Sequence, residues 1–291
     1  MTLLGDARRV IGVLLLAFGG AAPSSTQGRT PAAVLDRFDL RPRAAVQGKL
    51  PNALQEISGL AVAADGRVFA HGDERAVVAQ VDACAAKAVK AFALGNPPVR
   101  GDFEGIAIAG ERFFLITSTG LLYEFREGAD GAAVTFSVID TGFGKVCELE
   151  GLAYDPSERT LLSGCKETAR PELRGQLVVL RWSLDRKAPA VPPRLTVPLR
   201  DVLNASGTKG FRTTSIERDA RSGHYFLVAG PERAIVEVTP TGQVLAARSL
   251  NRQLHLQPEG LTFVGDSLLV IADEGATGGT RGAITCYRRA P

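Results

Sequence analysis

Short segments in which apolar residues alternate with small or polar ones recur along the chain, and four of them share one motif. In this motif a glycine opens an apolar run, and in three of the four segments a glutamate stands directly before it. The segments are EISGLAV at 56–62, DFEGIAI at 102–108, ELEGLAY at 148–154 and QPEGLTF at 257–263. Alternation with a period of two is typical of β-strands. The motif therefore indicates a strand that is repeated as part of a larger unit.

The motif recurs with a nearly constant period. Its glycines are Gly59, Gly105, Gly151 and Gly260, and Ser215 takes the equivalent place in a degenerate fourth segment, RTTSIERD at 212–219. Successive positions are 46, 46, 64 and 45 residues apart. The long interval contains KETARPELRG at 166–175 and DRKAPAVPPRL at 185–195. Both are rich in proline and charge, and we interpret them as loop insertions.

Within every unit, a turn and further apolar strands follow the motif, such as FFLIT at 113–117 and YFLVAG at 225–230. Units of about 40 to 50 residues with four short strands are typical of β-propeller blades. The fifth unit ends after its third strand, so we expect an N-terminal segment, 34–42 or 44–50, to supply the missing outer strand and close the ring. The prediction is an all-β, five-bladed propeller. The alternative is a six-bladed ring, in which the N-terminal segment and the long insertion contain a degenerate sixth blade.

Acidic residues occupy strand ends that meet at one mouth of the predicted channel. Because strand side chains alternate, residues one and three before each motif glycine point to the same side. Directly before the glycine stand Ser58, Glu104, Glu150, Thr214 and Glu259, and two residues further back stand Glu56, Asp102, Glu148, Arg212 and Gln257. The ends of the second strands add Asp73, Glu74, Glu167, Glu232, Asp273 and Glu274. We therefore expect carboxylates to crowd this mouth.

Crowded carboxylates raise one another's pKa unless a cation compensates their charge. A hard divalent cation with oxygen ligands suits this composition, and Ca²⁺ tolerates irregular geometry better than Mg²⁺. The predicted ligands are Glu104, Glu150, Glu259, Ser58 and Glu56. A secondary acidic ring is predicted from Asp73, Glu74, Glu167, Asp273 and Glu274. The structural alternative is that each motif glutamate accepts backbone N–H bonds from the next blade.

The four motifs, together with HGDERAVVAQVD at 71–82 and IADEG at 271–275, resemble the SdiA-regulated family of exported bacterial proteins. The resemblance covers roughly residues 52–288, and its short motifs are shared in looser form with esterase-like phytase, NHL-repeat and gluconolactonase-like propellers. It implies a five-bladed propeller with a central Ca²⁺ and no established biochemical activity. The fourth unit departs from the pattern at Arg212, Thr214 and Ser215. A ligand from that blade is therefore in question.

Two histidines are candidate bases for a metal-dependent hydrolase of a phosphoester or a lactone. His71 directly precedes GDE, and His255 lies four residues before Glu259, so both are expected near the acidic mouth. A histidine titrates near neutral pH and is able to activate water beside a metal. The alternative is that each is a surface loop residue. No G-x-S-x-G motif accompanies them.

The N-terminus has the layout of a secretory signal peptide, with Arg8 and Arg9 before an apolar run from Val10 to Phe18 and small residues after it. We expect a signal at 1–23, the segment carrying the closing strand at 24–50 and the propeller at 51–291, with a retained anchor as the alternative. The run is short for a membrane span, so no transmembrane segment is expected in the mature chain. The protein is predicted to be periplasmic or secreted.

An exported chain keeps disulfides, and four cysteines are present. The turn at 155–159 places Cys165 opposite Leu149 and close to Cys147, which predicts a Cys147–Cys165 bond. Cys84 and Cys286 fall in outer strands of the first and fifth units, which are neighbours across the closure, but at different depths, which disfavours their pairing.

The formal net charge of +3 is spread without a basic stripe, which argues against nucleic acid as a partner. We expect a monomeric calcium-binding module for an envelope protein or a small-molecule ligand. A Ca²⁺-dependent hydrolase is the alternative.

Overall fold

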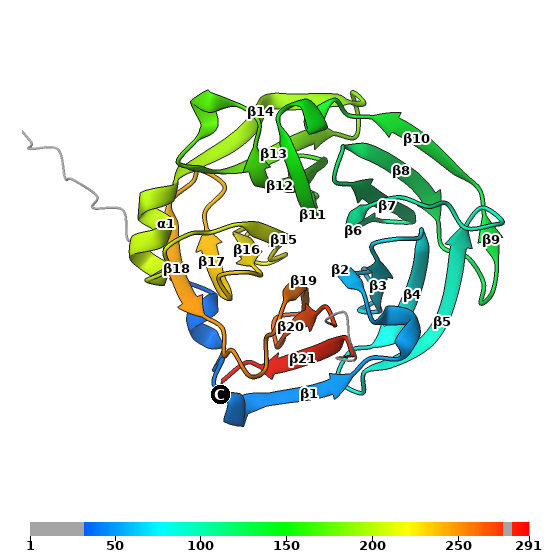
Figure 1. Ribbon diagram of the computed structural model, residues 1–291, viewed down its shortest axis with the longest axis horizontal. Helices are drawn as coiled ribbons and strands as arrows, with labels where there is room; N and C mark the ends of the chain where they lie inside the picture. The colour runs from blue at the N-terminus through cyan, green and yellow to red at the C-terminus, as the bar shows by residue number, and fades with distance from the viewer. Residues whose placement is uncertain (1–31, 276–280, 291) are drawn as a thin grey trace, which may run out of the picture. The chain divides into compact units, whose positions relative to one another are not determined.

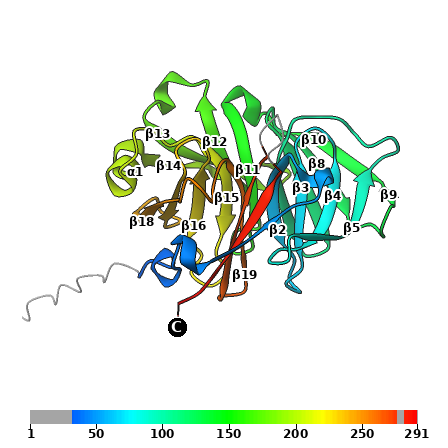
Figure 2. The ribbon, with the colours of Figure 1, turned by 60° about the horizontal axis from the view of Figure 1, so that its bottom comes forward.

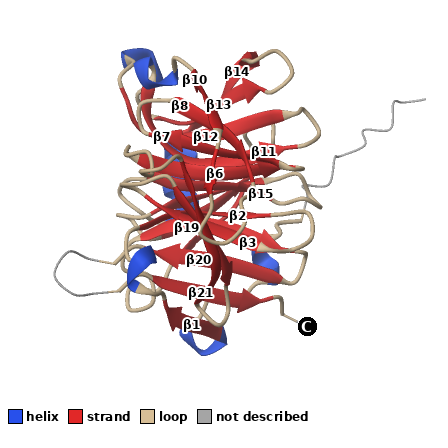
Figure 3. Cartoon of the chain, turned by 90° about the vertical axis from the view of Figure 1, so that its right-hand side faces the viewer, coloured by secondary structure: helices blue, strands red, loops and turns tan. Residues whose placement is uncertain are grey.

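The computed structural model describes residues 32–275 and 281–290, which form a five-bladed β-propeller. Figure 1 shows the five sheets arranged around a central axis, each with its innermost strand at the channel. Figure 3 shows that strands make up most of the domain. The five-bladed prediction is confirmed and the six-bladed alternative is wrong. The predicted signal peptide lies outside the described residues.

Each blade runs from an inner strand to an outer strand at the rim. The first is β2 (Ile57–Val62), β3 (Val68–Gly72), β4 (Val77–Asp82) and β5 (Lys87–Leu94), with the short β9 (Ala133–Val134) added in parallel. The second is β6 (Phe103–Ala109), β7 (Arg112–Thr117), β8 (Leu121–Arg126) and β10 (Phe136–Asp140). The third is β11 (Cys147–Asp155), β12 (Thr160–Thr168), β13 (Gln176–Ser183) and β14 (Ala188–Pro198). The fourth is β15 (Thr213–Arg218), β16 (Tyr225–Ala229), β17 (Ala234–Val238) and β18 (Val244–Ser249). The fifth is β19 (Pro258–Val264), β20 (Leu268–Asp273), β21 (Ala283–Arg288) and β1 (Ala45–Lys49).

The N-terminal segment closes the ring, as predicted. β1 pairs antiparallel with β21, from Ala45 opposite Tyr287 to Lys49 opposite Ala283, and Figure 1 shows it along the outer side of β21. Ahead of β1, the backbone N–H groups of Val34 and Leu35 donate hydrogen bonds of 2.9 and 2.8 Å to the fully buried carboxylate of Glu237. The closing segment is therefore attached to both the fifth and the fourth blade.

Hydrophobic clusters lie between neighbouring blades, so the inner and middle strands are covered on both faces. Between the first and second blades, Phe69 and Phe113 meet edge to face with ring centroids 5.0 Å apart. Between the fourth and fifth, Phe226 and Phe263 do the same at 4.7 Å. Burial on both faces explains why strands such as YFLVA read as continuous apolar runs.

The predicted insertions are only partly loops. The segment 166–175 is the end of β12 and a short 3₁₀ turn (Pro171–Leu173), but most of 185–195 belongs to the long outer strand β14. An outer strand tolerates Pro189, Pro192 and Pro193 because one of its edges has no neighbouring strand to hydrogen-bond. The helix α1 (Leu199–Ser206) follows, and it lies at the periphery beside β14 and β18 (Figures 1 and 2).

Four further 3₁₀ turns complete the described structure: Leu35–Arg37, Pro42–Ala44, Asn52–Leu54 and Phe143–Lys145. Among the described residues, no helix has the length and apolar character that a membrane span requires.

Candidate functional site

A β-bulge lies at the residue before the motif glycine in four blades. The strand pairing jumps from Phe103 to Gly105 and from Pro258 to Gly260, so Glu104 and Glu259 have no partner in the second strand. The same jump leaves out Ser58 and Thr214. In the third blade, register shifts lie on both sides of Leu149 and Glu150. A bulge bends the strand and re-aims a side chain, which explains how these residues leave the regular ladder at the channel mouth.

The glycine that follows the bulge allows inner strands to approach closely. A Cβ atom on Gly105 would lie 2.4 Å from the carbonyl carbon of Gly151. Gly151 itself has a φ of +69°, and a Cβ there would lie 2.6 Å from the backbone nitrogen of Ile216. Only glycine fits such positions. The Glu-Gly motif therefore combines a redirected carboxylate with a narrow waist of the channel.

Glu104 lies in a strongly acidic environment. Burial raises its pKa to about 10, and the charges of Glu150, Asp102 and Glu259 add to this effect. Its Oε2 atom accepts a hydrogen bond of 3.0 Å from the hydroxyl of Ser58. A carboxyl with this pKa is protonated at neutral pH. Glu104 is therefore held in a neutral form that a nearby cation would ionise.

Glu150 has a cationic partner that the sequence analysis missed. The Nζ atom of Lys166 donates to its Oε1 atom at 2.6 Å and lies 3.5 Å from Glu148. Burial raises the pKa of Glu150 to about 8 although Lys166 opposes the shift. Burial lowers the pKa of Lys166, but the charge and hydrogen bond of Glu150, together with the charges of Glu148 and Glu104, keep that pKa above its usual range.

Glu259 is half-buried and completes the set of motif glutamates at the mouth. Burial raises its pKa, and its Oε1 atom accepts a hydrogen bond of 2.9 Å from the side-chain amide of Gln257. The same amide donates to Glu274, whose pKa is raised to about 7 by burial and by the charge of Glu259. Glu104, Glu150 and Glu259 come from three different blades, and their charges act on one another.

The other predicted ligands divide into two groups. Ser58 is buried against Glu104. Glu56 is exposed, and its pKa is raised first by the charge of Asp73 and then by burial and Glu74, so it belongs to the rim of the mouth. In the predicted secondary ring, Asp73 and Glu274 are half-buried with raised pKa values, whereas Glu74 and Glu167 are exposed. Asp273 is buried and bound to His255.

The fourth blade contributes no carboxylate at the motif position. The hydroxyl of Thr214 donates to the backbone carbonyl of Pro258 at 2.7 Å and accepts a bond from Gly230 N–H. Arg212 pairs with Glu232 at 3.0 Å. Thr214 therefore links the fourth and fifth blades through backbone groups.

Both candidate histidines are fully buried, so the expectation of a surface loop histidine is wrong for each. The Nδ1 atom of His71 hydrogen-bonds the carbonyl of Gly72, and burial lowers the pKa of His71 to about 4. The ring of His255 lies between Asp273, 2.8 Å from Nδ1, and the hydroxyl of Tyr287, 2.7 Å from Nε2. Both ring nitrogens of His255 are therefore bonded, whereas among the described residues the buried Nε2 atom of His71 has no hydrogen-bond partner.

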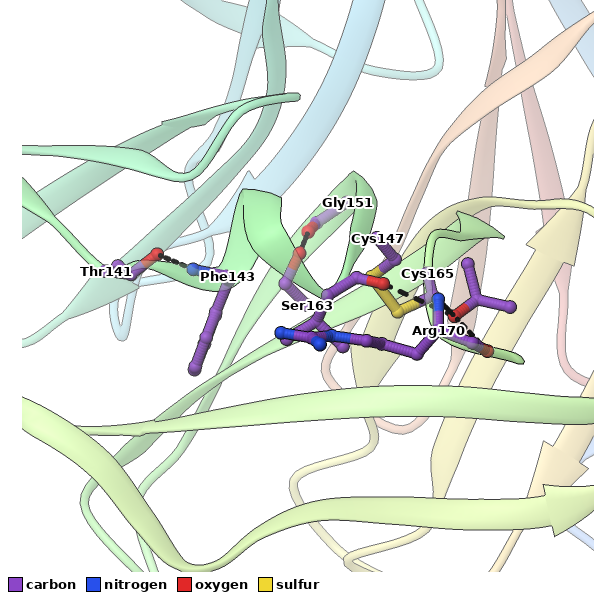
Figure 4. Close-up of a disulfide and its surroundings, with 9 residues drawn as sticks. Thr141, Phe143, Cys147, Gly151, Ser163, Cys165 and Arg170 are labelled. Carbon is purple, nitrogen blue, oxygen red and sulfur yellow. Dashed lines mark hydrogen bonds between the residues drawn. A yellow bond between two sulfur atoms is a disulfide. The ribbon is translucent and has the colours of Figure 1, made fainter. Parts of the chain in front are cut away.

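The predicted Cys147–Cys165 disulfide is present (Figure 4). It joins the start of β11 to β12, close in sequence to Glu148, Glu150 and Lys166. Figure 4 also shows the hydroxyl of Ser163 donating to the carbonyl of Gly151, at 2.8 Å. The disulfide therefore fixes the hairpin that carries the Lys166–Glu150 pair.

A second disulfide, Cys84–Cys286, corrects the expectation that these cysteines do not pair. It joins the turn after β4 to the third strand of the fifth blade, across the ring closure. β21 is a third strand rather than an outer one, because β1 lies outside it. Two disulfides are typical of a protein that folds in an oxidising compartment outside the cytosol.

The donor set matches a hard cation, because it consists of carboxylates and hydroxyls with no thiolate or accessible imidazole. In the described part of the chain, however, no three acidic, histidine or cysteine side chains are already gathered in a metal-holding arrangement. Lys166 occupies one oxygen of Glu150, and Ser58 one oxygen of Glu104. A cation at this mouth therefore has to compete with Lys166 and with the protons on the glutamates.

No family model and no curated protein matches the chain. Solved structures match it over most of its length. Glutaminyl cyclase from Myxococcus xanthus is 17% identical with a TM-score of 0.54, covering 85% of this chain and 98% of the cyclase. The PQQ-bound aldose sugar dehydrogenase from Streptomyces coelicolor is 13% identical with a TM-score of 0.52, covering 84% and 99%. A luciferin-regenerating enzyme is 9% identical with a TM-score of 0.52, covering 85% and 97%. These likenesses support the propeller fold alone.

Proposed function

We propose that the acidic mouth binds a divalent cation, with Ca²⁺ preferred, and that the exported propeller is a cation-dependent binding module of the cell envelope. The observation that carries the proposal is the set of three motif glutamates, the buried Glu150 and the half-buried Glu104 and Glu259, which Lys166 neutralises only in part. The raised pKa values of Glu104, about 10, and of Glu150, about 8, mean that ionising these carboxyls destabilises the fold. Such strongly perturbed groups are typical of a functional site rather than of a purely structural one. A divalent cation relieves this repulsion.

The residues that would hold the cation are Glu104, Glu150 and Glu259, with Ser58 beside Glu104. All provide oxygen, and a Ca²⁺ ion accepts irregular arrangements of six to eight oxygen ligands, with water filling the remainder. Glu56, Asp73 and Glu274 lie at the rim or half-buried and add negative charge there. They favour the approach of a cation from solvent.

The resemblance to the SdiA-regulated family favours the same assignment, because it implies a central Ca²⁺ in an exported propeller. Membership in that family, and residence in the periplasm or outside the cell, form part of the proposal. The occupant of the mouth is an envelope protein or a small molecule that contacts the bound cation and the rim.

A cation-dependent hydrolase of a phosphoester or lactone is the second candidate. The observation in its favour is Lys166, whose Nζ atom lies 2.6 Å from Glu150 and offers a positive charge for an anionic substrate oxygen. The solved structures of similar fold include enzymes, which is compatible with either candidate.

Thermal unfolding of the metal-stripped mature protein with added Ca²⁺ or Mg²⁺ tests the proposal. We expect Ca²⁺ at one hundred times its dissociation constant to stabilise the native chain by about 2.7 kcal/mol. The increment should vanish in Glu104→Gln combined with Glu150→Gln. Glu167→Gln, at an exposed position next to Lys166, is the matched control and should keep it. If neither ion raises the midpoint of the native protein, the cation site is rejected.

The hydrolase candidate has its own readout. Hydrolysis of p-nitrophenyl phosphate and of a γ-lactone should require the cation and should be lost in Glu104→Gln. If Ca²⁺ binds but neither substrate turns over, the binding module is favoured over a hydrolase of these substrates.

A further inference from the structure

A cavity of about 710 Å³ lies at the opposite end of the channel. It is lined by the ends of the inner strands and by the turns that follow them, whereas the acidic mouth lies at the starts of those strands. Glycines at the motif positions bring the inner strands together between the two ends. The cavity is therefore a separate compartment from the candidate cation site. Its volume is that of a small-molecule site.

The walls of this cavity are mainly apolar. Ala61, Ile106, Leu152 and Phe263 line it, one from each of four blades. The fourth blade instead contributes the charged run Glu217, Arg218 and Asp219. An apolar wall with polar groups concentrated on one side suits an amphipathic ligand. Its apolar part would lie against the first, second, third and fifth blades, and its polar part against the fourth.

Among the described residues, two carboxyls of the lining, Glu217 and Asp219, have no cationic side chain within ion-pair distance. Arg218 lies 3.0 Å from the buried Asp155, and Arg221 lies 2.9 Å from Asp266. Asp219 accepts two hydrogen bonds from Ser222.

The carboxyl of Glu217 also has unused hydrogen-bonding capacity. It accepts one bond of 2.7 Å from the hydroxyl of Thr262 and one of 2.8 Å from the backbone N–H of Arg218. A carboxylate has about four acceptor sites. Burial raises the pKa of Glu217 to about 7, the charge of Asp219 adds to this effect, and the charge of Arg218 opposes it. These two contacts fix the carboxyl at the cavity wall and leave lone pairs for a donor.

We propose that this cavity binds small amphipathic amines, with the ammonium group at Glu217 and the alkyl part against Ala61, Ile106, Leu152 and Phe263. The proposal is independent of the cation site, since no residue is shared between the two. It assigns the fourth blade, which lacks a motif carboxylate at the acidic mouth, a polar role at the other end of the channel.

Titration calorimetry with n-alkylamines, 1-alkanols and alkanoates in buffer containing a chelator tests the proposal. Above about pH 8, where Glu217 is largely ionised and the amines are protonated, hexylamine should bind at least tenfold more tightly than 1-hexanol. Hexanoate should not bind. Each added methylene from butylamine to hexylamine should improve affinity about fourfold, as expected for apolar burial.

Variants on both sides of the cavity make the test specific. Glu217→Gln should abolish the preference for amine over alcohol, and Ala64→Trp, at an exposed lining position, should weaken both ligands at least tenfold. Glu111→Gln, at an exposed position outside the lining and paired with Arg126, is the control and should change neither. Glu104→Gln combined with Glu150→Gln should leave amine binding intact.

Equal binding of the three ligand classes, or an amine preference that persists in Glu217→Gln, would overturn the proposal. Loss of amine binding in the Glu104 and Glu150 variant would do the same, because it would place the amine at the acidic mouth. If Glu217→Gln fails to fold, Ala64→Trp tests the proposal instead, and unchanged binding of both ligands in that variant would overturn it. None of these results depends on whether Ca²⁺ binds.

Discussion

The Nζ atom of Lys166 lies 2.6 Å from the Oε1 atom of Glu150, whose side chain is 1% exposed. This amine is the one cationic partner of the three motif glutamates that the described residues provide within ion-pair distance. Burial raises the pKa of Glu104 and of Glu150, and a single positive charge does not balance the three carboxylates. Lys166 is therefore both a stabilising partner of Glu150 and a competitor for any cation that binds there.

Lys166→Gln should destabilise the metal-free protein and strengthen Ca²⁺ binding. Removing the amine leaves Glu150 with an unpaired buried carboxyl, which costs about 1–3 kcal/mol. The same change removes a repulsive charge from the cation site, so Ca²⁺ affinity should rise at least tenfold. Chemical denaturation and calorimetry measure the two effects separately. Arg212→Gln, which removes a cation bound to Glu232 instead, should leave Ca²⁺ affinity unchanged. Weaker Ca²⁺ binding in Lys166→Gln would show that Lys166 organises the site rather than competes for it.

Glu104→Gln should stabilise the metal-free protein at alkaline pH. The pKa of Glu104 is raised from 4.5 to about 10, so its contribution to stability is fully present below about pH 4.5 and is lost as the pH rises toward the folded-state value. The pKa of Glu150 moves in the same direction, to about 8. Glutamine keeps the shape without ionising.

Denaturation in a chelator at about pH 6 and about pH 8.5 should therefore show the difference in unfolding free energy widening in favour of Glu104→Gln, by about 1–3 kcal/mol. Glu167→Gln is the control and should follow the native curve. A constant difference between the two pH values would mean that Glu104 is already ionised at about pH 6, which would contradict its raised pKa.

Much of the fold was predictable because the repeat is simple. A glycine recurring every 45 or 46 residues before an apolar strand indicates blades, and the incomplete fifth unit indicates closure by the N-terminus. The prolines of β14 were misleading, because an outer strand edge accepts residues that an inner strand rejects. The Cys84–Cys286 pairing was not predicted because Cys84 lies in the turn after β4 rather than in an outer strand, which removes the expected difference in depth.

The acidic residues of the candidate site were predictable from the sequence, but their lysine partner was not. Period-two alternation predicted Glu104, Glu150 and Glu259 at one mouth. The bulges that redirect Glu104 and Glu259 leave no sign in the sequence beyond the glycine that follows each of them. Lys166 was overlooked because it lies in a stretch interpreted as a loop insertion. Its position directly after Cys165, which was expected opposite Leu149, was the signal that could have placed it at the mouth.

The two disulfides should differ in their contribution to stability. Cys84–Cys286 spans 202 residues and Cys147–Cys165 spans 18. In the chain-entropy description, replacing both cysteines by serine should cost about 5 kcal/mol for the longer loop and about 3 kcal/mol for the shorter. Only the second pair of replacements should also weaken Ca²⁺ binding, because that bond fixes the hairpin carrying Glu150 and Lys166. Denaturation and calorimetry of the two double variants measure this, and equal losses of Ca²⁺ affinity would contradict the assignment.

The N-terminal segment should be required for a closed ring. Glu237 accepts the backbone N–H groups of Val34 and Leu35, and β1 covers the edge of β21. A chain that begins at Leu50 should expose that edge, lose several kcal/mol of stability and self-associate, because an unpaired strand edge is a template for another strand. A chain that begins at Ala32 retains all of these contacts and is the control.

Glu237→Gln separates the attachment of the segment from the strand itself. It removes the charge that accepts both N–H groups, which should cost about 1–3 kcal/mol while β1 stays paired. Hydrogen exchange should then increase at 34 and 35 but remain slow at 45–49. Fast exchange across both regions would mean that Glu237 holds the whole closing segment in place. Unchanged exchange at 34 and 35 would show that packing of Leu35 and Phe38 in the hydrophobic cluster between the fourth and fifth blades is sufficient.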